Sequence, residues 1–296
     1  MTLPHPRYQG VWLPLVSPFK DGDLDEASVR RMVARYAAQV DGFILAATTG
    51  EGMALSRDET RRLAGWTAEE LAESGASTPV VIGISGAVTA NVVEAVRAAE
   101  DLPAAGLLIA CPYYVRPTQQ GLRLHFEAIA DATDRDILVY NIPYRTGVNM
   151  ANDTLLRLAE RPNIVGVKDC CADPAQSRDL IARKPGGFSV LCGEDAGYLT
   201  ALRQGADGGV VASAHLRPEI FRDIHHLARD GRWAEAERAW TGVAAIPDLI
   251  FAEPSPSALK HALWRTGLID TPDLRLPMTP PSAELAGRVE AYLEQL

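Results

Sequence analysis

Lys168 has the most reactive setting of any residue in this chain. It ends the apolar run 164–167 and is followed by Asp169, so its amine lies where a buried strand gives way to a loop. Burying an ammonium group without a partner costs several kcal/mol unless the group gives up its proton. A neutral lysine amine is a nucleophile that forms a Schiff base with carbonyl substrates. The alternative, from position alone, is a lysine that extends its amine to solvent.

Polar side chains also follow the other apolar runs. Taken singly, each has a structural explanation, because threonines cap helices, buried tyrosines bond to backbone groups and an arginine can form a surface ion pair. Their joint placement after successive strands favours a common site instead. These residues are Thr48, Thr49, Tyr114, Tyr140 and Arg145, and the seventh run is followed by the stretch that begins at Gly193.

The elements that position them alternate between short apolar runs and amphipathic helical stretches. Eight such runs predict a parallel (β/α)8 barrel, in which catalytic residues lie at the carboxyl ends of the strands. The alternative is an open doubly wound sheet, but no Gly-x-Gly-x-x-Gly follows the first strand, where a dinucleotide fold requires it. The runs begin near Val11, Gly42, Val80, Gly106, Ile137, Ile164, Ser189 and Gly208.

Helix signals divide the chain further. Ser56 and Glu59 form a capping box ahead of a helix, and Pro174 and Pro218 suit first helical turns. Beyond about residue 226 no strand pattern remains, and three helical stretches are predicted at 233–251, 257–266 and 283–296. We therefore predict a catalytic barrel over residues 1–226 and a C-terminal helical domain over residues 227–296.

Composition restricts the class of protein. With 296 residues, 47% hydrophobic and 23% charged, the chain is long enough for one large barrel and is typical of a globular protein. A net charge of -9 argues against a nucleic-acid partner. We expect neither a signal peptide nor a membrane span. The four cysteines show no metal or redox spacing, which favours the reducing cytoplasm.

Six stretches of the chain resemble the dihydrodipicolinate synthase and N-acetylneuraminate lyase family of pyruvate-dependent class I aldolases. They occur in the family order along nearly the whole chain. The resemblance, closest to the synthase branch, implies a TIM barrel with a C-terminal helical domain, assembled as a homotetramer of tight dimers. The stretches are 48–51 (TTGE), 112–117 (PYYVRP), 140–143 (YNIP), 166–169 (GVKD), 193–195 (GED) and 274–280 (LRLPMTP).

The resemblance also implies catalytic roles. Lys168 condenses with the keto group of pyruvate, and the resulting iminium acidifies the adjacent methyl group. Tyr140 carries protons in imine formation and in the aldol step. Thr48 relays protons between Tyr140 and Tyr114, and the residue matching Tyr114 reaches into the neighbouring subunit's site.

Binding roles follow in the same way. Thr49 holds the pyruvate carboxylate, and Gly193 and Val210 line the pocket. Arg145 can hold a second carboxylate with its planar guanidinium. The expected reaction is the condensation of pyruvate with an aldehyde, most simply L-aspartate semialdehyde, in lysine biosynthesis, without a metal or cofactor.

Some positions depart from the synthase pattern. Val88 and Val92 stand where lysine-inhibited synthases carry an asparagine and a glutamate, so we do not expect feedback inhibition by lysine. Gly52 replaces a common serine, and His215 stands where an asparagine is common and could bind a hydroxylated substrate. An aldolase or dehydratase of keto-deoxy sugar acids, or a sialic-acid-lyase-like enzyme, therefore stays open as the alternative.

Other classes are disfavoured. A non-catalytic binding protein would not need Lys168, Tyr140, Thr48 and Tyr114 together. A metal-dependent aldolase needs histidines at strand ends, and the six histidines show no such spacing. A pyridoxal phosphate enzyme would need a glycine-rich phosphate loop, which we do not find.

Overall fold

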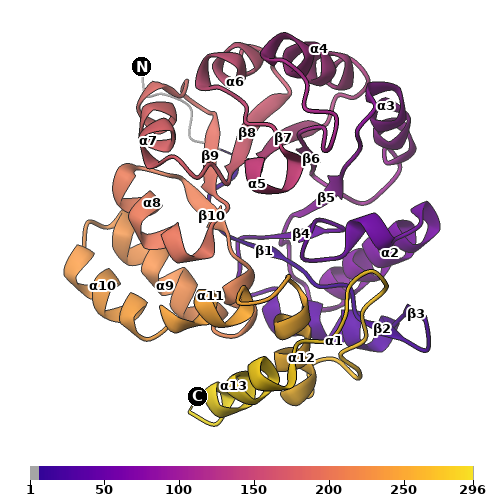
Figure 1. Ribbon diagram of the computed structural model, residues 1–296, viewed down its shortest axis with the longest axis vertical. Coiled ribbons are helices and arrows are strands. Elements are labelled where there is room, and N and C mark those ends of the chain that lie inside the picture. The colour runs from indigo at the N-terminus through magenta and orange to yellow at the C-terminus, as the bar shows by residue number, and fades with distance from the viewer. Residues whose placement is uncertain (1–6, 296) are drawn as a thin grey trace.

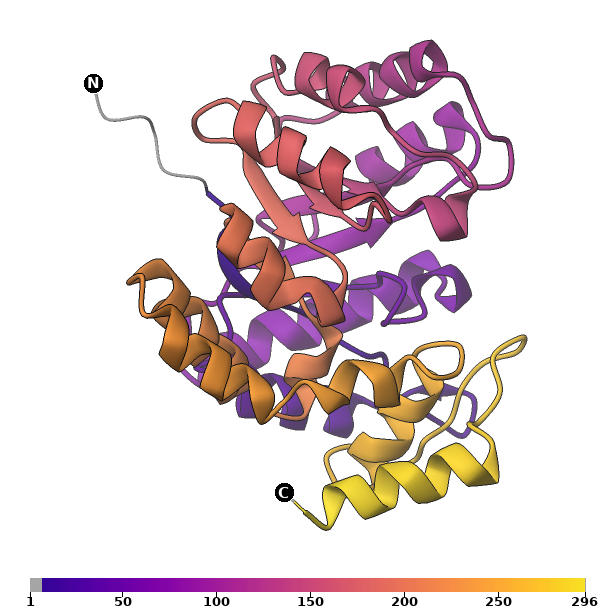
Figure 2. The same cartoon turned by 60° about the vertical axis from the view of Figure 1, so that its left-hand side comes forward.

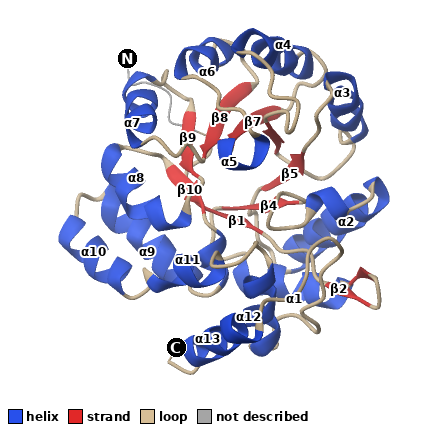
Figure 3. Cartoon of the chain, in the orientation of Figure 1, coloured by secondary structure: helices blue, strands red, loops and turns tan. Residues whose placement is uncertain are grey.

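The computed structural model describes residues 7–295. Within this range eight parallel strands close into a barrel surrounded by helices, which confirms the predicted fold (Figures 1 and 3). The strand order around the barrel is β1-β10-β9-β8-β7-β6-β5-β4, with β4 paired to β1. The strands are β1 (Gly10–Pro14), β4 (Gly42–Leu45), β5 (Val80–Ile84), β6 (Gly106–Ala110), β7 (Asp136–Asn141), β8 (Ile164–Asp169), β9 (Ser189–Cys192) and β10 (Gly208–Val210).

The strands are apolar throughout because both of their faces are buried. Successive side chains of a strand point to opposite faces. In β1, Val11 and Leu13 join the layer between strands and helices, whereas Trp12 packs inside the barrel. The interior is thus filled with side chains, and any substrate must enter at its end.

One helix follows each barrel strand and covers it. Ser56 and Glu59 form the predicted capping box of α2, and Pro174 and Pro218 occupy the first turns of α7 and α9. The covering helices are α1 (Glu26–Tyr36), α2 (Arg57–Glu73), α3 (Thr89–Ala98), α4 (Gln119–Ala130), α6 (Asn152–Leu158), α7 (Pro174–Arg183), α8 (Tyr198–Gln204) and α9 (Pro218–Arg229).

Short elements decorate the loops between these units. Strands β2 (Phe19–Lys20) and β3 (Asp23–Leu24) pair as a small antiparallel hairpin after β1. Helix α5 (Pro143–Thr146) follows β7 directly at the barrel mouth. No helix among residues 7–295 is both long and apolar enough to cross a bilayer.

The C-terminal segment consists of helices that lie against one side of the barrel, coloured orange to yellow in Figure 2. They are α10 (Trp233–Thr241), α11 (Ala245–Ile250), α12 (Ser257–Arg265) and α13 (Ala283–Leu293). The stretch predicted as one helix over 233–251 is two. Gly242 caps the C-terminal end of α10. Pro247 has no backbone N–H, but it lies in the first turn of α11, where an N–H would have no partner within the helix.

The predicted domain boundary between residues 226 and 227 falls inside the last turn of α9, and residues 1–6 of the predicted barrel domain lie outside the described range. Helices α11, α12 and α13 share a small apolar cluster of their own, while Ile246 and Leu259 join the main core. The division into two domains stays a prediction.

Candidate active site

Lys168 points into the barrel because of an irregularity in β8. Ile137 of β7 pairs with Ile164, but the next residue, Leu138, pairs with Gly166, so Val165 is an extra residue in the ladder. A β-bulge of this kind shifts the alternation of side chains by one position. Lys168 therefore stands beside Tyr140 and faces inward, where an uninterrupted strand would have turned it toward the helices.

The amine of Lys168 is buried and unpaired. The side chain is 5% exposed, and its Nζ lies 4.2 Å from the centroid of the Tyr140 ring. The chain has four lysines, all within residues 7–295, and the other three, Lys20, Lys184 and Lys260, each form an ion pair with a carboxylate. Lys168 forms none in this range, so its amine is free to react with a ligand.

Gly193 makes room for this side chain. A Cβ at position 193 would come within 3.0 Å of Cε and Cγ of Lys168 and within 2.3 Å of Sγ of Cys170. Any side chain larger than hydrogen would therefore displace the lysine stem. Gly193 thus lines the cavity for a steric reason, because only glycine lets the Lys168 stem approach the backbone this closely.

Tyr140 lies near the end of β7 and lines the same cavity as Thr48, which comes from the loop after β4. Burial raises the pKa of Tyr140 well above 10, opposed in part by the hydrogen bond with Thr48. The phenol is therefore neutral at physiological pH and can both donate and accept a proton. A proton carrier beside an unpaired amine is the arrangement that imine chemistry requires.

The loop that carries Thr48 and Thr49 is a compact turn. The amide of Glu51 donates to the carbonyl of Thr48 (3.1 Å), and that of Gly52 donates to the carbonyl of Ala47 (3.0 Å). The hydroxyl of Ser17 donates to the carbonyl of Gly50 (2.6 Å). Thr49 is 7% exposed and lines the same cavity as Lys168.

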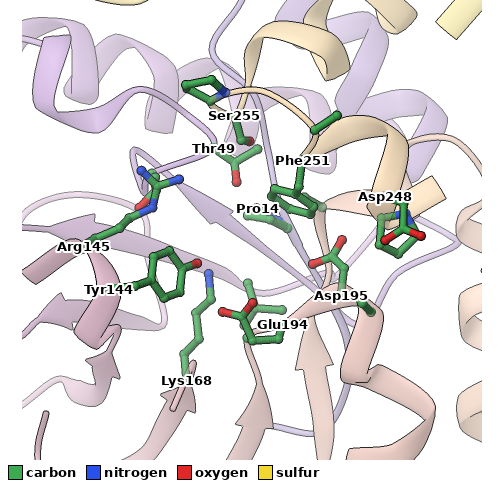
Figure 4. A pocket seen from close by; sticks show the side chains of 18 of the residues that line it. Pro14, Thr49, Tyr144, Arg145, Lys168, Glu194, Asp195, Asp248, Phe251 and Ser255 are labelled. Carbon is green, nitrogen blue, oxygen red and sulfur yellow. The ribbon is translucent and has the colours of Figure 1, made fainter. Parts of the chain in front are cut away.

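These groups surround one cavity of about 710 Å³ at the carboxyl ends of the strands. In Figure 4, Arg145 of α5 lies on one side, Nζ of Lys168 lies near the centre, and Glu194 and Asp248 lie on the opposite side. The cavity is thus positively charged on one side and negatively charged on the other. Seven of the eight predicted site residues line it: Thr48, Thr49, Tyr140, Arg145, Lys168, Gly193 and Val210.

Tyr114 is the exception. It is 89% exposed, has a φ of 70°, and donates its backbone N–H to the carbonyl of Thr146 (3.1 Å). It is not among the residues that line the cavity of its own chain. The fold of a single chain therefore does not bring Tyr114 to Lys168.

Asp195 is a site residue to which sequence reasoning assigned no role. It is 4% exposed and accepts a 2.6 Å hydrogen bond from the backbone N–H of Ser213. Burial raises its pKa to about 6, against the opposing effects of Ser213 and of the Lys168 charge. The motif 193–195 belongs to the family resemblance. The burial of Asp195, however, depends on contacts with residues distant in sequence, such as Ser213.

The cavity also takes lining residues from the C-terminal segment that sequence reasoning did not select. Phe251 and Ser255 come from the connection between α11 and α12, and Asp248 comes from α11 itself. No local motif in the segment 248–255 points to the site. Its position at the cavity follows from how the C-terminal helices pack.

His215 does not bind substrate. It is 3% exposed, its Nδ1 lies 2.8 Å from the carbonyl oxygen of Ala212, and its Nε2 accepts from the backbone N–H of Val16 (3.4 Å). Burial lowers its pKa to about 4. With both ring nitrogens engaged, the imidazole is neutral and structural, and the geometry favours a bystander over a group that binds a hydroxylated substrate. Residues 7–295 also contain no group of three or more side chains placed to hold a metal ion.

Comparisons with known proteins agree with this geometry. The model of the dihydrodipicolinate synthetase family matches residues 7–296. A 4-hydroxy-tetrahydrodipicolinate synthase 2 of Clostridium acetobutylicum is 40% identical over 290 residues, which cover 97% of this chain and 100% of that protein. A 4-hydroxy-tetrahydrodipicolinate synthase of Phenylobacterium zucineum is 36% identical over 291 residues, 97% of each chain.

Solved structures give the same result. The chloride-inhibited dihydrodipicolinate synthase of Acinetobacter baumannii, solved in complex with pyruvate, is similar with a TM-score of 0.92 and 33% identity. The match covers 97% of this chain and 98% of that one. Sequence motifs, barrel and whole-chain matches therefore confirm the predicted resemblance, and this chain belongs to the dihydrodipicolinate synthetase family.

Proposed function

We propose that this protein condenses pyruvate with L-aspartate semialdehyde through a Schiff base on Lys168, forming 4-hydroxy-tetrahydrodipicolinate for lysine biosynthesis. The observation that carries the proposal is the unpaired, buried amine of Lys168, aimed into a cavity beside the phenol of Tyr140. The curated relatives with this activity, and the related structure with pyruvate, support it.

The first half of the reaction forms an enamine. Nζ of Lys168 adds to the keto carbon of pyruvate, Tyr140 protonates the departing hydroxyl, and water leaves to give an iminium. The iminium then draws electrons from the adjacent methyl group, which loses a proton. In this proposal Thr48, which lines the cavity together with Tyr140, holds the phenol for both proton transfers.

The second half forms the carbon–carbon bond. The enamine carbon attacks the aldehyde carbon, and the new alkoxide takes a proton. The amino group of aspartate semialdehyde then attacks the imine carbon and displaces Lys168, which closes a six-membered ring. The net change is loss of one water from the two substrates.

The loop after β4 provides the site for the pyruvate carboxylate. Thr49 lines the cavity within a tight turn, and its hydroxyl and backbone N–H are donors of the kind that bind a carboxylate. Gly193 and Val210 line the space next to the Lys168 stem.

The charge distribution favours aspartate semialdehyde over a keto-deoxy sugar acid. Arg145 stacks near the ring of Tyr144 (5.8 Å) and forms no ion pair among the described residues, so its guanidinium is available for a carboxylate. Glu194 and Asp248 face it across the cavity (Figure 4). Aspartate semialdehyde carries both a carboxylate and an ammonium group, whereas a keto-deoxy sugar acid carries only the carboxylate.

A direct assay tests the proposal. Purified protein is incubated with pyruvate and borohydride, and the labelled residue is identified by mass spectrometry, with Lys168→Ala as control. We expect pyruvate-dependent labelling of Lys168, and turnover when aspartate semialdehyde is added. Labelling elsewhere would refute the Schiff-base mechanism. Turnover of a keto-deoxy sugar acid but not of aspartate semialdehyde would show that the substrate is wrong and the mechanism right.

We also propose that the active unit is a dimer, within a homotetramer, in which Tyr114 completes the partner's site. Tyr114 is 89% exposed and the adjacent Val115 is 53% exposed. Their aromatic and aliphatic side chains are therefore accessible for contact with a second subunit. Tyr114→Phe should lower turnover, and mixing it with Lys168→Ala should restore activity, because the hybrid contains one intact site. No gain on mixing, with subunit exchange verified, would contradict a shared site.

We place the protein in the cytoplasm. All four cysteines are free thiols in the structure, and two of them, Cys111 and Cys170, are buried, as expected where disulfides do not form. Fractionation of cells that express the tagged chain checks this, and recovery from an oxidising compartment would contradict it.

A further inference from the structure

The loop that carries Thr48 and Thr49 is held from the C-terminal segment. Glu51, next to this loop, adopts a left-handed backbone (φ 49°), which turns its side chain inward. There it forms a 2.6 Å ion pair with Nζ of Lys260 in α12. The two side chains are 3% and 0% exposed, although 209 positions separate them in sequence.

Arg275 holds the same loop from a second point. Its backbone N–H donates to the other carboxylate oxygen of Glu51 (3.3 Å), and its guanidinium donates to the carbonyl of Ala54 (2.8 Å). It also pairs with Glu59 in the first turn of α2 (2.5 Å). Arg275 therefore fixes the loop's exit to the helix that follows it.

One aromatic ring, that of Phe19, lies close to both cations. The centroid of Phe19 lies 4.3 Å from Nζ of Lys260 and 4.2 Å from Cζ of Arg275. Both are within the range of cation–π attraction. Lys260, Glu51 and Phe19 are buried, and the partly exposed Arg275 closes the group from outside. We call these four residues the C-terminal clamp.

Stability alone does not account for a buried ion pair. Removing two charges from water costs so much that apolar replacements of similar volume are often as stable. Burial accordingly lowers the pKa of Lys260, with Glu51 opposing the effect. What the pair supplies beyond stability is direction, because the carboxylate of Glu51 is held at one oxygen by Lys260 and at the other by Arg275.

We propose that Lys260 and Arg275 are positioning residues that act through Glu51 to hold Thr48 and Thr49 in the geometry that binds the pyruvate carboxylate. The inference rests on the proposed function, since it assumes that this loop binds pyruvate. It gives a role to Glu51 of the motif TTGE and to Arg275 of the motif LRLPMTP, neither of which had one in the chemistry. A displacement of about 1 Å can cost as much as 100-fold in rate when a reacting group must be oriented.

Charge-neutral replacement separates positioning from stability. Glu51→Gln and Lys260→Met alone each leave a buried charge unpaired, whereas the double variant leaves none. We expect the thermal midpoint of the double variant to lie above those of both single variants. We also expect all three to need about tenfold more pyruvate than the wild type for half-maximal borohydride labelling of Lys168.

A matched pair at the other end of the barrel serves as control. Lys184, which follows α7, and Asp207, which directly precedes β10, form a partly buried ion pair at the amino end of the strands. Lys184→Met with Asp207→Asn should change the thermal midpoint but leave the pyruvate dependence of labelling at the wild-type value.

The results for the single and double variants decide whether the clamp positions the loop. If the double variant regains both stability and wild-type pyruvate dependence, the clamp is only structural and the inference is wrong. Wild-type pyruvate dependence in the two single variants would overturn it as well. Absence of pyruvate-dependent labelling in the wild type would instead refute the proposed function, so the two failures are distinguishable.

Discussion

Asp195→Asn tests the electrostatics of the site through stability. The carboxyl group of Asp195 is buried, and its pKa is raised from 3.8 to about 6, chiefly by burial. An amide of the same size keeps an oxygen to accept from the backbone N–H of Ser213 but carries no charge. The substitution therefore removes the titration of this position while preserving its packing.

The sign and the size follow from the raised pKa. The folded state binds the proton of Asp195 more tightly than the unfolded state does, so protonation of Asp195 stabilises the fold. This stabilisation is complete below pH 3.8 and is lost as the pH rises through 6. The difference between 3.8 and about 6, at 1.36 kcal/mol per pKa unit, amounts to about 3 kcal/mol. About 2 kcal/mol of this is lost between pH 4.5 and pH 7.5.

Urea unfolding of both proteins at several pH values in this range measures the effect. The stability of Asp195→Asn relative to the wild type should rise by about 2 kcal/mol from pH 4.5 to pH 7.5, because other titrating groups cancel in the difference. Asp248→Asn, at the exposed side of the same cavity, is the control for removing a negative charge. If the free energy of unfolding of Asp195→Asn relative to the wild type stays constant or falls as the pH rises, the assignment of Asp195 as a buried carboxyl group with a raised pKa is refuted.

Three further predictions concern activity. Tyr140→Phe keeps the buried ring but removes the proton carrier, so steady-state turnover should fall about 100-fold or more, and near-normal turnover would contradict the role. Arg145→Ala should raise KM for aspartate semialdehyde and cost about 2–5 kcal/mol in kcat/KM, with a smaller effect on pyruvate labelling; equal losses for both substrates would argue against a separate anion site. Millimolar lysine should not inhibit, because Val92 is buried in the core and Val88 offers no polar group; saturable inhibition in the same assay would show that the expectation from these positions is wrong.

Local patterns in the chain were enough to predict the elements and the chemical groups. Apolar runs buried on both faces marked the strands, and the capping box at Ser56 marked the start of α2, because both signals depend only on neighbouring residues. The polar residues after the strands could be selected in advance since the carboxyl ends of parallel strands meet at one face of a barrel. Lys168 was predicted to be the nucleophile on the same basis.

Interactions between distant residues decided the rest. The extra residue Val165 in β8 turns Lys168 inward, and this depends on how β8 pairs with β7, which no local pattern shows. The ion pair between Glu51 and Lys260 joins positions 209 apart. The burial of Asp195 likewise comes from elements packed around it. The sequence by itself determined which groups are available for imine chemistry, whereas closure of the barrel and packing of the C-terminal helices decided their orientation, burial and charge, because these depend on contacts that exist only in the folded chain.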